Sequence, residues 1–118
     1  LVPLQAEYYA MEGLGELLRT IKGVRRALNP DLRREGIVIT MTDARNRLCR
    51  EVEGQARQVF GEGVFQTTIP RNVRLGEAPS HGKSIVEYAP GSTGAQAYMD
   101  LADELIRRQQ AKGQREAV

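Results

Sequence analysis

Residues 36–41 read Gly-Ile-Val-Ile-Thr-Met, and this run decides the fold class. It is short, rich in β-branched side chains and almost continuously apolar, without the alternation of a strand that has one face in water. Such a run is typical of a strand buried on both faces of a parallel sheet. Residues 64–69 form a second predicted strand, and residues 1–4 resemble the end of an apolar strand whose beginning is missing, as in a fragment.

Helical patterns separate the predicted strands. Apolar residues recur in steps of three and four over 7–28, and in steps of four over 48–60, where Gly61 and Gly63 close the helix. A last helix is expected to begin after Ser92 or Thr93. Its predicted apolar stripe consists of Tyr98, Leu101, Ala102, Leu105 and Ile106. The alternation of strands and helices predicts an α/β fold with a parallel sheet over residues 1–108, followed by a polar, frayed tail over 109–118.

Composition narrows the class of protein. With 118 residues, 41% hydrophobic and 27% charged, the chain is expected to form one globular domain. No apolar run has the length of a membrane span and no signal peptide opens the sequence, so a cytoplasmic location is expected. A single cysteine, Cys49, and a single histidine, His81, exclude an internal disulfide and the multi-cysteine or paired-histidine metal motifs.

Catalytic constellations are not apparent in this sequence. It has no glycine-rich phosphate loop ending in Gly-Lys-Ser/Thr, no dinucleotide fingerprint and no nucleophile elbow. Ser80 and His81 are neighbours in a segment rich in proline and glycine, where a nucleophile and its base rarely meet in the required geometry. Cys49 is interpreted as a packing residue, although nearby arginines could activate it, and Asp43 as a turn residue.

Basic residues follow both predicted strands, where ligands of parallel sheets usually bind. Arg45, Arg47 and Arg50 come after the strand ending at Met41, and Arg71 and Arg74 come after the strand ending at Ile69. Two adjacent parallel strands would bring them to one end of the sheet, a suitable phosphate surface. The alternative is a solvated rim with pairs such as Arg47–Glu51. A second basic run is either another contact face or the polar side of the first helix: Arg19, Lys22, Arg25, Arg26, Arg33 and Arg34. Residues 70–84 form a long irregular segment, which is usually functional or mobile.

Three blocks of this sequence resemble the chromosome-partitioning ATPases of the ParA/Soj family. They are Pro-Leu-Gln-Ala-Glu-Tyr-Tyr-Ala-Met-Glu-Gly-Leu at 3–14, Met-Thr-Asp-Ala-Arg at 41–45, and Ile-Pro-Arg-Asn-Val-Arg-Leu-Gly-Glu-Ala-Pro-Ser-His-Gly-Lys at 69–83. The resemblance extends from Leu1 to about Ile106. It implies a P-loop NTPase-like fold of the deviant Walker type, of which this chain is similar only to the carboxyl-terminal half.

The resemblance also implies a function. Members of the family use ATP and Mg2+, close into a homodimer around the nucleotide, bind nonspecific DNA of the nucleoid and respond to a centromere-binding partner of the ParB/Spo0J type. The family's phosphate loop, magnesium-binding residues and catalytic aspartate belong to the amino-terminal half, and none of them occurs in this sequence. Negligible ATP turnover is therefore expected of this chain alone.

The matching blocks also imply roles for individual residues of this sequence. The resemblance suggests that Arg45 and Arg74 contact DNA phosphates, with Arg71 and Lys83 as further candidates. It suggests an adenine-side wall made by Pro70, Arg71 and Asn72, with Met41 close by, and a dimer interface that includes Gln5, Glu7 and Tyr8. No catalytic residue and no metal ligand is expected within this chain.

Two other hypotheses remain open from the sequence. The chain could act as a stand-alone basic module that binds DNA or dimerises without ATPase activity, in which case its DNA binding would be salt-sensitive and independent of ATP. It could also be a fragment without a stable role, because a bare sheet edge and uncovered apolar faces favour aggregation.

Overall fold

The computed structural model describes residues 1–116. The regular strands and longer helices are β1 (Val2–Gln5), α1 (Ala10–Ala27), β2 (Ile37–Thr40), α2 (Arg47–Phe60) and α5 (Thr93–Glu116). Between α2 and α5 lie shorter helical elements, in the order η1 (Gly61–Gly63), α3 (Val73–Glu77), η2 (Ala78–His81) and α4 (Ile85–Tyr88). The predicted alternation of strands and helices is confirmed from β1 to α2.

The two strands are parallel and adjacent. Val2 lies opposite Ile37 and Gln5 opposite Thr40. Residues 64–70 run along the other side of β2 and touch it through parallel bridges from Val64 to Ile37 and from Pro70 to Thr42. The order across the sheet is therefore β1, β2 and then this segment.

The prediction of a regular strand at 64–69 is wrong. The N–H groups of Phe65 and Ile69 donate to the carbonyls of Ile37 and Ile39, so four residues of this segment span only two residues of β2. The extra residues bulge away from the sheet, and the N–H groups of Gln66 and Thr67 donate to the Glu104 carboxylate instead. A bulge breaks the ladder locally, which leaves two isolated bridges in place of a strand.

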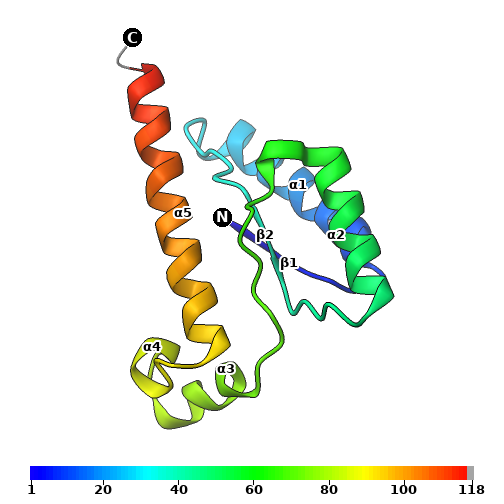
Figure 1. Ribbon diagram of the computed structural model, residues 1–118. Helices are drawn as coiled ribbons and strands as arrows, with labels where there is room; N and C mark the ends of the chain where they lie inside the picture. Colours follow the sequence, from blue (N-terminus) through cyan, green and yellow to red (C-terminus); the bar gives the residue numbers. More distant parts are fainter. Residues whose placement is uncertain (117–118) are drawn as a thin grey trace.

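Helices cover both faces of the sheet. On one face α1 and α2 pack over a cluster that includes Leu4, Ile37 and Ile39, and on the other face α5 packs over Val38, Phe65 and Ile69. Figure 1 shows β1 and β2 between α5 on one side and α1 and α2 on the other. Consecutive residues of β2 thus enter opposite cores, which explains its continuous apolar run.

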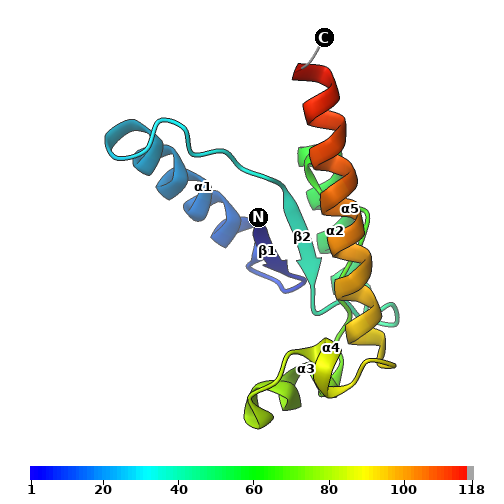
Figure 2. The same cartoon turned by 90° about the vertical axis from the view of Figure 1, so that its left-hand side faces the viewer.

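Residues 70–84 are largely helical, where the sequence predicted an irregular segment. The Asn72 side chain caps α3 by accepting the N–H of Arg74, and Ser84 caps α4 by accepting the N–H of Glu87. These helices have one turn or little more, too short to produce the apolar periodicity that sequence reasoning requires. Figure 2 shows α3 and α4 beyond the carboxyl end of β2, next to the start of α5.

Helix α5 differs from its prediction in length and in its buried face. It extends to Glu116 because most residues after Arg108 are good helix formers, whereas a frayed tail was predicted from 109; residues 117–118 of that tail lie outside the described part. Of the predicted stripe, Leu101 is buried, but Ile106 is 55% exposed. The charged Glu104 is buried instead. In residues 1–116 no helix has the length and apolarity needed to cross a membrane.

Candidate functional site

The site is built where β2 and the segment 64–70 end. The N–H of Thr42 donates to the Ile69 carbonyl at 3.1 Å, and the N–H of Arg71 donates to the Thr42 carbonyl at 3.0 Å. Just before this junction Met41 has a φ of 55°, a left-handed conformation that is uncommon for a residue with a side chain. The junction places Met41 and Pro70 beside each other, although they are 29 positions apart in the sequence.

A pocket of about 650 Å³ opens at this junction. Its lining contains all four residues that the sequence analysis assigned to nucleotide binding, Met41, Pro70, Arg71 and Asn72. Val73, Leu75 and Tyr98 also line it, from α3 and α5. The structure therefore brings the predicted residues into one largely apolar concavity, and their role in binding a nucleotide stays a prediction.

Asn72 uses part of its hydrogen-bonding capacity to hold the pocket wall. Its Oδ1 accepts the N–H of Arg74, and its Nδ2 donates to the Thr93 hydroxyl at the start of α5. The side chain thus ties the pocket wall to α3 and α5. An aromatic ring in the pocket would meet mainly apolar side chains and the edge of this turn.

The first basic group consists of Arg45 and Arg71, whose charges act on Asp43. The Asp43 carboxylate accepts the N–H of Arg45 at 3.0 Å, and the guanidinium Nε of Arg45 lies 3.4 Å away. The backbone hydrogen bond from Arg45 is the largest influence on the Asp43 carboxyl and lowers its pKa, with the charges of Arg45 and Arg71 acting in the same direction. The turn role predicted for Asp43 is confirmed. The Arg45 side chain is 93% exposed and carries its charge into solvent.

The second basic group lies on α3 and the turn that follows it. Arg74 Nη1 is 3.7 Å from Glu77 Oε2, and the side chain of Arg74 is 58% exposed. Lys83 is exposed and follows η2. Arg45, Arg71 and Arg74 thus come from segments that follow the carboxyl end of the sheet, as their positions in the sequence predicted. Lys83, which only the family resemblance suggested, lies later in the same segment as Arg74. Arg45 and Arg74 belong to separate basic groups.

The predicted interface residues lie at the outer edge of β1. Gln5, Glu7 and Tyr8 line a second cavity, of about 500 Å³, formed with the first turns of α1. Tyr8 is 75% exposed and its ring packs edge-on against Tyr9, with ring centroids 4.9 Å apart. These three residues are close together, and β2 separates them from the segment 64–70.

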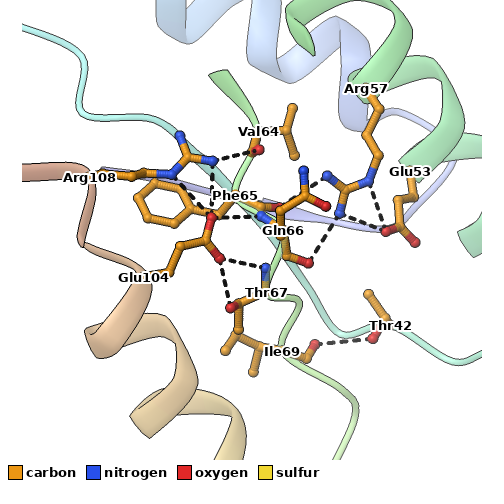
Figure 3. Close-up of polar contacts among 10 residues, drawn as sticks. All are labelled: Thr42, Glu53, Arg57, Val64, Phe65, Gln66, Thr67, Ile69, Glu104 and Arg108. Atoms are coloured by element: carbon orange, nitrogen blue, oxygen red, sulfur yellow. Dashed lines mark hydrogen bonds and ion pairs between the residues drawn. The ribbon is translucent and has the colours of Figure 1, made fainter. Parts of the chain in front are cut away.

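A polar network behind the pocket was missed by sequence reasoning. Glu104 of α5 accepts hydrogen bonds from the N–H groups of Gln66 and Thr67 and from the Thr67 hydroxyl, each at 2.8 Å. Arg108 pairs with Glu104 at 3.0 Å and donates to the Val64 carbonyl (Figure 3). A glutamate with i+4 arginine resembles an ordinary surface pair, so the sequence carried no signal that Glu104 is buried.

Two other sequence interpretations can be compared with the geometry. Cys49 is buried and its Sγ lies 3.4 Å from the Ala6 carbonyl, which fits the packing role. His81 stacks on Tyr88 with ring centroids 4.8 Å apart. Within residues 1–116 no hydrogen bond joins Ser80 to His81, so the structure gives no support to a Ser-His nucleophile.

Comparison with known proteins assigns the fold to a family. The model of the CobQ/CobB/MinD/ParA nucleotide binding domain matches residues 4–85, which contain the end of β1, all of β2 and most of the pocket residues. The chain belongs to this family. Within it, the chain is 58% identical over 109 residues to the chromosome-partitioning ATPase Soj of Thermus thermophilus, covering 92% of this chain and 44% of that protein.

Two further relatives agree with this assignment. The sporulation initiation inhibitor protein Soj of Bacillus subtilis is 52% identical over 104 residues, 88% of this chain and 41% of that protein. The chromosome partitioning protein ParA of Myxococcus xanthus is 47% identical over 118 residues, 100% of this chain and 42% of that protein. The ParA/Soj resemblance of the sequence is thereby confirmed. The chain spans less than half the length of these relatives.

The residues present fit one end of ATP. Met41 and Pro70 offer apolar contact to a flat base, and the pocket has room for it. The phosphates and Mg2+ need backbone N–H groups of a glycine-rich loop, a lysine and carboxylate or hydroxyl ligands. Residues 1–118 contain no such loop. The fit therefore concerns the base alone.

Proposed function

We propose that the chain is the carboxyl-terminal part of a ParA/Soj-type partitioning ATPase. In this role it supplies the base-side wall of the ATP site and a basic surface for nonspecific DNA. The observation that carries the proposal is the junction of Thr42 with Ile69 and Arg71, because it puts the pocket and the basic segments at one end of the sheet. The family assignment and the names of the Soj and ParA relatives support the same role.

The residues have separate tasks in this proposal. Met41 and Pro70 contact the base, while Asn72 holds the wall in place through its bonds to α3 and Thr93. Arg45 and Arg74 bind phosphates of DNA, assisted by Arg71 and Lys83. Contacts to phosphate alone carry no sequence information, so DNA of any sequence would serve.

The remaining parts of the proposed function lie outside the pocket. Gln5, Glu7 and Tyr8 form part of the interface between two copies, and the exposed tyrosines are suitable for it because aromatic side chains are enriched at protein interfaces. Binding of ATP and Mg2+ at the phosphate end, and stimulation by a ParB/Spo0J-type protein on the nucleoid, belong to the whole partitioning protein. The chemistry that ATP supplies there is phosphoryl transfer to water.

The experiment measures binding of fluorescent ATP and of a random-sequence DNA duplex to the full gene product. Met41→Glu puts a charge into the apolar wall and is expected to weaken ATP binding about tenfold, since the carboxylate loses hydration when the base covers it. The matched control is Met99→Glu on α5, where the methionine is 48% exposed and outside the pocket.

The two binding curves separate the alternatives. DNA binding that requires ATP in the wild type, and that Met41→Glu weakens together with ATP binding, is the expected result. Equal effects of Met41→Glu and Met99→Glu on ATP affinity would contradict the base wall. DNA binding of full strength without ATP would favour a stand-alone basic module instead.

A further inference from the structure

Glu77 on α3 has two partners that meet at one oxygen. The Tyr88 hydroxyl on α4 donates to Glu77 Oε2 at 2.6 Å, and Arg74 Nη1 lies 3.7 Å from the same Oε2. The first contact is a short hydrogen bond, and the second is an ion pair beyond hydrogen-bond distance. The carboxylate is therefore held mainly by the tyrosine, and Arg74 is held loosely.

Tyr88 is fixed in this position from its other side. Its ring stacks on His81 with an interplanar angle of 18°, and α4 packs against α3, η2 and α5. The hydrogen bond to the Glu77 carboxylate is the main reason that the pKa of the Tyr88 phenol is raised above its ordinary value, and the nearby Arg74 side chain acts in the opposite direction. Three elements thus orient one hydroxyl at Glu77.

This arrangement affects how easily Arg74 can change partners. A phosphate that takes Arg74 leaves the Glu77 carboxylate without its cation, and the Tyr88 hydrogen bond keeps that carboxylate satisfied. Without the hydroxyl, Oε2 would have Arg74 as its only described side-chain partner and would hold it more tightly. Without the carboxylate, the ion pair that competes with the phosphate for Arg74 would be lost.

We propose that Glu77 and Tyr88 are positioning residues that set how readily Arg74 is released to a nucleic-acid phosphate. Glu77 competes with the phosphate for the guanidinium, and Tyr88 weakens that competition. The inference rests on the proposed function, because it takes Arg74 as a DNA contact, and it adds a device that adjusts the strength of that contact.

A double-mutant cycle on the full gene product, with ATP and a random-sequence duplex at low salt, tests the proposal. Glu77→Gln keeps an acceptor for Tyr88 and removes the charge, and it is expected to tighten DNA binding about two- to fivefold, the range of an exposed ion pair. Tyr88→Phe is expected to weaken DNA binding by a similar factor. Both effects are expected to disappear when Arg74→Ala is also present.

A matched control separates positioning from general charge effects. Glu87→Gln on α4 removes the same charge from an exposed residue. Its effect is expected to be equal with Arg74 and with Arg74→Ala. ATP affinity is the second readout, and it is expected to stay unchanged in the Glu77 and Tyr88 variants.

The outcomes distinguish the inference from the proposed function. If Arg74→Ala weakens DNA binding but the Glu77→Gln and Tyr88→Phe effects persist in its presence, the positioning role is overturned and the DNA contact stands. If Arg74→Ala leaves DNA binding unchanged, the contact assigned to Arg74 fails and the positioning role fails with it.

Discussion

Glu104 and Thr67 are joined by two hydrogen bonds to one oxygen: Glu104 Oε1 accepts both the N–H and the hydroxyl of Thr67, each at 2.8 Å. The second carboxylate oxygen accepts the N–H of Gln66 and pairs with Arg108. Two residues later the chain reaches Ile69, which returns to β2 and leads directly into the pocket wall at Pro70. The carboxylate of α5 therefore fixes the bulge that positions this wall.

Replacing Glu104 is expected to destabilise the fold. Glu104→Gln keeps one acceptor oxygen but removes the charge, leaving an N–H group and Arg108 without their full set of partners. The free energy of unfolding is expected to fall by about 1–3 kcal/mol. Urea unfolding measures it, with Asp103→Asn at the neighbouring exposed position as control. An equal, small effect of both variants would show that the network contributes little.

The same carboxylate predicts a pH dependence of stability. Burial alone would raise the pKa of Glu104, but the hydrogen bonds from Thr67, Gln66 and Arg108 outweigh it, and the pKa lies below the ordinary value of 4.5. A lowered pKa in the folded state means that this stabilisation is complete above the unfolded pKa near 4.5 and is lost as the pH falls through the folded pKa.

Urea unfolding of the wild type and of Glu104→Gln between pH 7 and pH 3 tests this sign. The difference in unfolding free energy is expected to be largest at neutral pH and to shrink as the pH falls below the unfolded pKa. A difference that grows toward pH 3 would contradict the assignment.

Gly94 is a point of close approach between α5 and the pocket. A Cβ at this position would lie 2.7 Å from Leu75 Cγ, so Leu75 would have to move, and Leu75 lines the pocket. Gly94→Ala is expected to destabilise the fold by about 1–3 kcal/mol, the usual range for overpacking. The midpoint temperature of thermal unfolding and the ATP affinity are the quantities measured, and both are expected to decrease.

Gly113→Ala in the same helix is the control for helix propensity. A Cβ there would meet no atom within 4 Å, so the substitution is expected to stabilise the helix by up to about 1 kcal/mol. Stabilisation of the fold by Gly94→Ala to the same degree would mean that α5 and α3 do not pack as described.

The sequence predicted the architecture well and the site only in part. The apolar run at 36–41 and the apolar stripe of α1 predict β2 and one core correctly, because a continuous apolar run and a helical periodicity follow directly from which side chains are buried. The bulge after Phe65 could not be predicted, because it depends on a carboxylate 37 positions away from Thr67. The contact of Tyr88 with Glu77 was also missed, because it arises from the packing of two short helices that leave no periodicity in the sequence.

The proposed function gives different tasks to the pocket and to the basic residues at one end of the sheet. The most direct test is the salt dependence of DNA binding by the full gene product with ATP, for the wild type, for Arg45→Ala with Arg74→Ala, and for Arg25→Ala on α1. The double variant is expected to bind all DNA sequences more weakly, with a salt slope smaller by about 2, one for each phosphate contact, and to keep its ATP affinity. An unchanged slope in the double variant, or an equal loss of affinity caused by Arg25→Ala, would contradict the DNA contacts proposed for Arg45 and Arg74.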